Sequence, residues 1–173
     1  MTTRILILEK FADTYARDLA RQFSAIDIHK AATAADIPVD LATIDVLVAF
    51  GIAINDGLIA RAKNLRWIAS LATGVDHFLR CPSLRRDTIL TSGRGIHGPA
   101  MRETVASLML ALARDTPRLV RNKADHRWDR GARWPLIAGK TAVVVGIGIS
   151  GIAIGQLLKA FGKIGRASCR ERV

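Results

Sequence analysis

The chain has 173 residues, half of them hydrophobic, which suits one domain or two small ones with a buried core. No apolar run reaches the roughly 18 residues that a membrane span requires, and Glu9 and Lys10 interrupt the first apolar stretch too early for a signal peptide. We therefore expect a cytoplasmic protein with no membrane partner. The formal net charge of +11 is spread along the chain rather than clustered with aromatic residues. This spread argues against a nucleic-acid partner and favours a solvated basic surface that can attract an anionic substrate or cofactor.

The first half of the chain alternates short apolar runs with helical patterns. Apolar residues at four-residue intervals predict one helix, and the capping oxygens of Asn55 and Asp56 predict the start of another. The helical stripe is formed by Phe11, Tyr15, Leu19 and Phe23. Strands are expected at residues 4–9, 26–29, 46–50, 66–71 and 88–91. Such alternation predicts an α/β fold, an open parallel sheet with helices on both faces.

A glycine-containing turn, residues 72–76, follows the fourth expected strand. Ligands of open parallel sheets lie beyond the carboxyl ends of the strands, where the backbone N–H groups of such a turn can hold a small carboxylate. An ordinary turn between strand and helix is an equal alternative for this stretch. Asp76 can equally be a helix cap.

The titratable residues of this half suggest no metal or nucleophilic site. Cys81 has no histidine or cysteine at metal-ligand spacing and is interpreted as a structural thiol. The four histidines lie in different local contexts, and we interpret His97 as the residue that starts a helix, without a catalytic role.

Residues 98–114 form the strongest helical pattern in the chain. Pro99 suits the first helical position, and the apolar stripe that follows is interpreted as core packing in a helix that bridges two domains. The stripe comprises Met101, Val105, Leu108, Met109 and Leu112. A polar, arginine-rich helix or loop follows to about residue 133, with Trp128 and Trp134 interpreted as packing anchors.

Residues 141–145 have the composition of a buried parallel strand and run directly into Gly146, Gly148 and Gly151, spaced as G-x-G-x-x-G, and then into a helical pattern. In a dinucleotide-binding turn the first glycine allows the tight turn, the second lets the backbone approach a diphosphate, and the third allows close packing of helix on strand. The helix start supplies unpaired N–H groups to the phosphates. A tight turn without a ligand is the alternative.

The last ten residues, 164–173, resemble the translation of a sequencing adapter, so we expect a non-native tail. The expected organisation is a substrate domain at 1–96 and the start of a dinucleotide domain at 97–163, truncated before a second strand can form. The acidic residue that would hold the ribose is therefore expected to be absent.

Three stretches, in this order, resemble the D-isomer-specific 2-hydroxyacid dehydrogenase family: ASLATGVDHF (69–78), GIHGPAMRETVASLMLALAR (95–114) and WPLIAGKTAVVVGIGISGIAIGQLLKAFG (134–162). The resemblance implies a flavodoxin-like domain followed by the truncated start of a Rossmann domain. It also implies an oxidoreductase that uses NAD or NADP to interconvert small 2-hydroxy and 2-oxo acids, as glyoxylate/hydroxypyruvate reductases do, and a parent protein that is a homodimer.

Residue by residue, the resemblance assigns two binding regions. Thr73 and Gly74 match the positions that bind the substrate carboxylate, and Thr104 matches a position near the nicotinamide. The turn residues that match the pyrophosphate site are Gly146, Gly148, Ile149, Ser150 and Gly151. Many members have Arg-Ile where this chain has Ile149-Ser150, which removes a possible side-chain contact to phosphate but keeps the backbone amides.

The family's catalytic arginine, glutamate and histidine would lie downstream of this chain, so no catalytic residue is assigned and the fragment is expected to be inactive. The alternative function is a non-catalytic NAD-binding regulator of the same architecture, which intact downstream catalytic residues would argue against.

Overall fold

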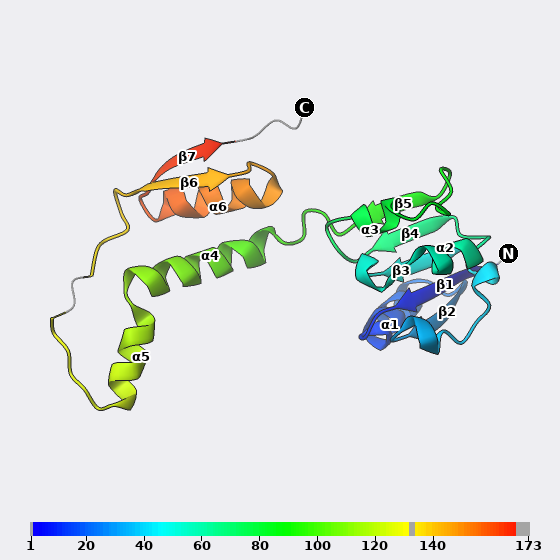
Figure 1. The fold of residues 1–173 in the computed structure, drawn as a ribbon, viewed down its shortest axis with the longest axis horizontal. Helices are drawn as coiled ribbons and strands as arrows, with labels where there is room; N and C mark the ends of the chain where they lie inside the picture. Colours follow the sequence, from blue (N-terminus) through cyan, green and yellow to red (C-terminus); the bar gives the residue numbers. More distant parts are fainter. Residues whose placement is uncertain (1, 132–133, 169–173) are drawn as a thin grey trace. The chain divides into compact units, whose positions relative to one another are not determined.

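The computed structural model describes residues 2–131 and 134–168 and divides the chain into two compact units, Met1–Arg94 and Gly95–Val173 (Figure 1). Each unit contains parallel strands covered by helices. Among the described residues, no helix combines the length and the hydropathy needed to cross a bilayer.

The first unit is built on a five-stranded sheet in the order β2-β1-β3-β4-β5, in which all neighbours are parallel. The strands are β1 (Thr3–Leu8), β2 (Ile26–Ala31), β3 (Val46–Ala49), β4 (Trp67–Ser70) and β5 (Ile89–Ser92). This is the flavodoxin-like strand order. The expected open parallel sheet is therefore confirmed, with strand ends that differ from the expected ones by at most two residues.

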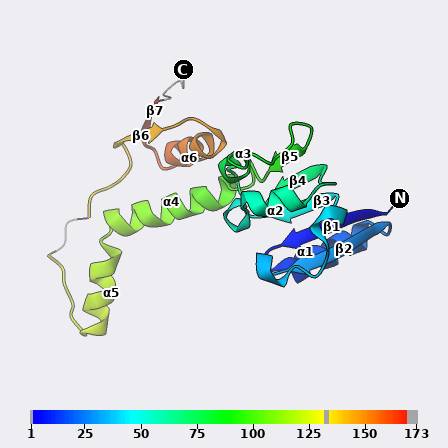
Figure 2. The same cartoon turned by 45° about the vertical axis from the view of Figure 1, so that its right-hand side comes forward.

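Both faces of this sheet are buried, as the alternation of side chains along β1 shows. Leu6 and Leu8 belong to the larger core cluster, on the face covered by α2 (Asp56–Arg61) and α3 (Asp76–Leu79). Ile5 and Ile7 point to the other face, which α1 (Ala12–Gln22) covers. A strand with two buried faces has a continuous run of apolar residues, as β1 does at Ile5–Leu8. Figure 2 shows the same sheet from a second direction.

The helix start at Asn55 is confirmed, because its side-chain oxygen accepts the N–H of Leu58 at 2.9 Å. Three short 3-10 helices that the sequence pattern did not reveal connect the other elements: η1 (Ala34–Asp36), η2 (Leu41–Thr43) and η3 (Gly51–Ala53).

The apolar stripe of α1 is only partly buried: Leu19 packs on the sheet, whereas its aromatic members are exposed. Ala12, Ala16 and Leu19 pack against the sheet, whereas the side chains of Phe11 and Phe23 are 61% and 53% exposed. Small alanine side chains let the helix axis approach the sheet closely, and this orientation turns the larger aromatic side chains outward.

The second unit contains three helices and a two-stranded parallel sheet. Its elements are α4 (Gly98–Ala113), α5 (Thr116–Ala124), β6 (Thr141–Val145), α6 (Ile149–Ala160) and β7 (Ile164–Ser168). Pro99 stands in the first turn of α4, as expected. The interpretation of its stripe as core is wrong for the described residues, because Leu108 and Leu112 are 61% and 82% exposed.

A second strand of the dinucleotide sheet is present, which corrects the expectation that the chain ends too early to form one. β7 pairs in parallel with β6 over five residues, from Thr141 opposite Ile164 to Val145 opposite Ser168. Main-chain hydrogen bonds form with little regard to side chains, so a short segment that follows a helix can pair in this way. β6 itself is less buried than its composition predicted, since Val143 and Val145 are 62% and 85% exposed.

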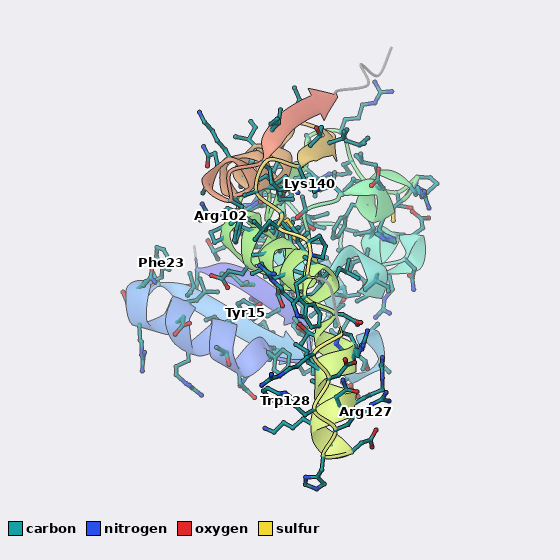
Figure 3. All side chains as sticks on the ribbon, turned by 90° about the vertical axis from the view of Figure 1, so that its left-hand side faces the viewer. Tyr15, Phe23, Arg102, Arg127, Trp128 and Lys140 are labelled. Atoms are coloured by element: carbon teal, nitrogen blue, oxygen red, sulfur yellow. The ribbon has the colours of Figure 1, made fainter. Side chains whose placement is uncertain are left out.

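The segment after α5 is held by an ion pair between Arg118 and Asp129. Hydrogen bonding to this guanidinium, with a further bond from the Gly131 N–H, lowers the pKa of the Asp129 carboxyl below its ordinary value. The Trp128 side chain, labelled in Figure 3, is 83% exposed, so its interpretation as a packing anchor is wrong. The Arg130 guanidinium lies over its ring, 5.8 Å from the ring centroid.

Candidate functional site

Two glycine-containing turns lie at the carboxyl ends of parallel strands, one in each unit. One follows β4 and the other follows β6. Ligands of open parallel sheets bind at this end of the strands, so these turns are the candidate binding elements.

The turn after β6 begins with a residue that needs glycine. Gly146 has φ of +95°, in the left-handed region where other residues are strained. It therefore reverses the chain directly after the strand and leads it toward the start of α6.

Gly148 is the cap residue of α6 and faces open space. A Cβ added there would meet no atom within 4 Å, and the backbone conformation, φ −69° and ψ −174°, is ordinary extended backbone. The first N–H groups of a helix have no partner inside it. Those of Ile149 and Ser150 donate to no other group among the described residues. Unpaired amides beside open space can receive an anion.

Gly151 permits the closest approach in the turn. A Cβ at this position would lie 2.0 Å from the carbonyl oxygen of Gly146 and 3.5 Å from Cγ1 of Val144. Since no side chain tolerates the first of these distances, the helix can sit on the strand only with glycine here. All three glycines thus have the geometry that the sequence motif predicts.

The turn after β4 is fastened on two sides by main-chain bonds. The Leu71 N–H donates to Ala49 O and the Gly93 N–H donates to Ala72 O, both at 3.0 Å. Thr73 and Gly74 are exposed, and within the described part of the chain their N–H groups donate to no protein acceptor. A small carboxylate can therefore reach these two amides. Asp76 is the first residue of α3 and not its cap, which is Val75.

Two other residues singled out in the sequence are placed on α4. The Thr104 hydroxyl is exposed and donates to Ala100 O one turn earlier at 2.9 Å. His97 is the cap residue of α4 and makes no side-chain capping bond, in agreement with a helix-start role.

One cavity in the first unit is not a candidate site. It has a volume of about 1180 Å³ and lies at the amino-terminal edge of the first sheet, opposite the glycine turn. Its arginines are already paired, Arg4 with Asp27 and Arg66 with Asp45. Among the described residues no group of three potential metal ligands comes together.

Two residues that support the turn after β4 escaped the sequence analysis. Ser70 is buried beneath the turn. Gly51 packs so closely on α3 that a Cβ there would lie 2.9 Å from Cβ of His77. Ser70 lies within the stretch 69–78 that carried the resemblance, but its residue type did not single it out, whereas the contact of Gly51 with His77 is between segments far apart in the sequence.

Cys81 is buried below the same helix, and its thiol donates to His77 O at 3.4 Å. Burial, followed by the charge of Asp56, raises the pKa of the Cys81 thiol. Because the thiolate is the reactive form, we expect iodoacetamide at pH 8 to modify Cys81 at least about tenfold more slowly in the folded chain than in urea. Site-resolved mass spectrometry measures both rates on the same cysteine. Equal rates would show that the thiol is accessible.

The comparisons with known proteins agree with this architecture. Residues 5–78 match the family described as D-isomer specific 2-hydroxyacid dehydrogenase, catalytic domain. A D-3-phosphoglycerate dehydrogenase of Archaeoglobus fulgidus is 31% identical over 104 residues, which are 60% of this chain and 20% of that protein.

Two solved structures extend the likeness across the chain. A D-isomer specific 2-hydroxyacid dehydrogenase family protein from Aeromonas salmonicida superposes with a TM-score of 0.87 at 28% identity, covering 96% of this chain and 53% of that structure. An NADPH-dependent glyoxylate/hydroxypyruvate reductase from Sinorhizobium meliloti, in complex with NADP and sulfate, gives 0.76 at 25% identity, covering 99% and 54%. The chain thus spans about a fifth of the curated relative and about half of these structures. Residues 5–78 are thus similar to the catalytic domain of the D-isomer specific 2-hydroxyacid dehydrogenase family, and the chain shares the fold of the Aeromonas salmonicida member of that family.

Proposed function

We propose that this chain is part of an oxidoreductase that uses NAD or NADP to interconvert small 2-hydroxy and 2-oxo acids. The observation that carries the proposal is the open backbone at Gly148, with the unpaired amides of Ile149 and Ser150 beside it. These groups would hold the cofactor's diphosphate at the start of α6. The nicotinamide, when bound, supplies or accepts the hydride.

The turn after β4 is the part of the chain that we propose binds the substrate carboxylate. The N–H groups of Thr73 and Gly74, which donate to no acceptor in the described structure, supply two neighbouring donors for the two oxygens of a single carboxylate. A reductase for glyoxylate and hydroxypyruvate among the structural neighbours supports 2-oxo acids of this size. Reduction of the carbonyl also requires a proton donor and a positive charge near the developing alkoxide, and we assign neither role to a residue of this chain.

The test separates nucleotide binding from folding. In Gly148→Ala the added methyl meets no protein atom, so the fold should be unchanged. The methyl would stand where the diphosphate approaches, and we expect the affinity for NADH and NADPH to fall by at least about tenfold. Amide chemical shifts of residues 146–151 in ¹⁵N-labelled chain, followed during titration with each nucleotide, measure this affinity.

The matched control is Gly155→Ala, which places a methyl in open space two turns further along the same helix. It should leave nucleotide affinity within about twofold. Shifts spread evenly over both units in the wild-type chain, or equal affinity of Gly148→Ala and wild type, would contradict a diphosphate site at this turn.

A further inference from the structure

Ser70 is the one buried polar side chain among the residues that the structure describes, with 5% of its surface exposed. It is the last residue of β4, directly before the turn that carries Thr73 and Gly74. A buried hydroxyl is costly unless it is hydrogen-bonded, so its partners indicate why the position is polar.

All partners of the Ser70 hydroxyl belong to the turn itself. Its oxygen accepts the Ala72 N–H at 3.3 Å. Its single proton can be donated to Ala72 O at 3.3 Å or to Gly74 O at 3.5 Å. The hydroxyl thus connects the main chain on both sides of Thr73 from below.

These bonds complete the attachment of the turn. The Ala72 carbonyl already accepts the N–H of Gly93 from the end of β5. The remaining turn residues, Thr73 and Gly74, have no main-chain bond of their own to hold them within the described structure. Ser70 is therefore a side chain that joins residues 72 and 74 through hydrogen bonds to their main chain.

We propose that Ser70 is a positioning residue for the carboxylate site: by holding Ala72 and Gly74 from beneath, it keeps the N–H groups of Thr73 and Gly74 directed outward and together. This inference rests on the proposed function, which makes those two amides the carboxylate donors. In Ser70→Ala the hydroxyl is lost while the strand and its apolar neighbours remain. The turn then samples other conformations, and a carboxylate must order it again on binding.

The test uses the ¹⁵N-labelled full chain and oxamate, a stable 2-oxo carboxylate. In Ser70→Ala we expect the Ala72 amide to exchange with solvent about tenfold faster and the dissociation constant of oxamate to rise about tenfold. Protection of the β3 and β4 amides should stay within about twofold of wild type, which shows that the sheet is intact.

Ser92→Ala is the matched control. Ser92 pairs with Ser70 in the neighbouring strand, is also partly buried, and its hydroxyl makes no hydrogen bond to any group that the structure describes. It should change neither the Ala72 exchange rate nor oxamate affinity. Ser70→Thr, which keeps the hydroxyl, should restore most of the affinity.

The outcomes separate the two proposals. If oxamate does not shift the Thr73 and Gly74 amides of the wild-type chain, the carboxylate site is wrong and the role of Ser70 at it is wrong as well. If wild type binds there and Ser70→Ala binds equally well, Ser70 has no positioning role, while the proposed function stands.

Discussion

Gly151→Ala is expected to destabilise the strand–turn–helix element of the second unit by about 3 kcal/mol, because the new methyl would lie 2.0 Å from the Gly146 carbonyl oxygen. The obstacle is main chain, which cannot rotate away as a flexible side chain can. Either α6 must move off β6 or the turn must open. Hydrogen exchange of the β6 amides, Thr141–Val145, should accelerate by about a hundredfold.

The control variant, Gly155→Ala, is expected to stabilise the second unit, whereas Gly151→Ala should destabilise it. Gly155→Ala lies in the same helix, where an added Cβ has nothing within 4 Å. Alanine is favoured over glycine inside a helix by about 1 kcal/mol, so this variant should slow exchange in α6. If both variants accelerate exchange alike, crowding at Gly151 is not the cause.

Phe78→Ala is expected to lower the free energy of unfolding of the first unit by about 3–5 kcal/mol. Among the side chains whose burial the structure describes, Phe78 is the largest that is fully buried, and it is part of the core that packs on the first sheet. Its removal leaves a cavity that the surrounding leucines and isoleucines fill only partly. Hydrogen exchange of the β3 and β4 amides across a urea series measures the loss within this unit alone.

The neighbouring residue provides the comparison. Leu79 belongs to the same helix but is 65% exposed, and Leu79→Ala should change stability by no more than about 0.5 kcal/mol. Because Phe78 anchors α3 immediately after the carboxylate turn, Phe78→Ala should also weaken oxamate binding, whereas Leu79→Ala should not. Comparable losses of stability in the two variants would show that α3 is not fixed through Phe78.

Local patterns predicted well what depends on local interactions. Asn55 caps α2 because a side-chain oxygen three residues before a free N–H can reach it in any fold. The strands are apolar because both faces of a parallel sheet are covered. The glycine spacing at 146–151 likewise depends on local geometry, because a tight turn between a strand and a helix needs glycine at these positions in any fold.

Patterns failed where packing partners decide the outcome. In α1, Ala12, Ala16 and Leu19 pack on the sheet, while the neighbouring aromatic residues Phe11 and Phe23 are exposed. Leu112 and Val143 have core composition but are exposed, since nothing in the described structure packs over them. A hydrophobic side chain tends to be buried, but it becomes buried only where another element packs over it.

The candidate site shows the same difference between features set by local sequence and features set by tertiary packing. The sequence by itself determined that a strand, a glycine turn and a helix follow one another at residues 141–160, because these requirements concern bonds between near neighbours in the chain. Only the tertiary structure decided that Gly51 packs against His77 and that β7 pairs with β6. These contacts depend on how strands and helices are placed in space, and no single stretch of sequence encodes that placement.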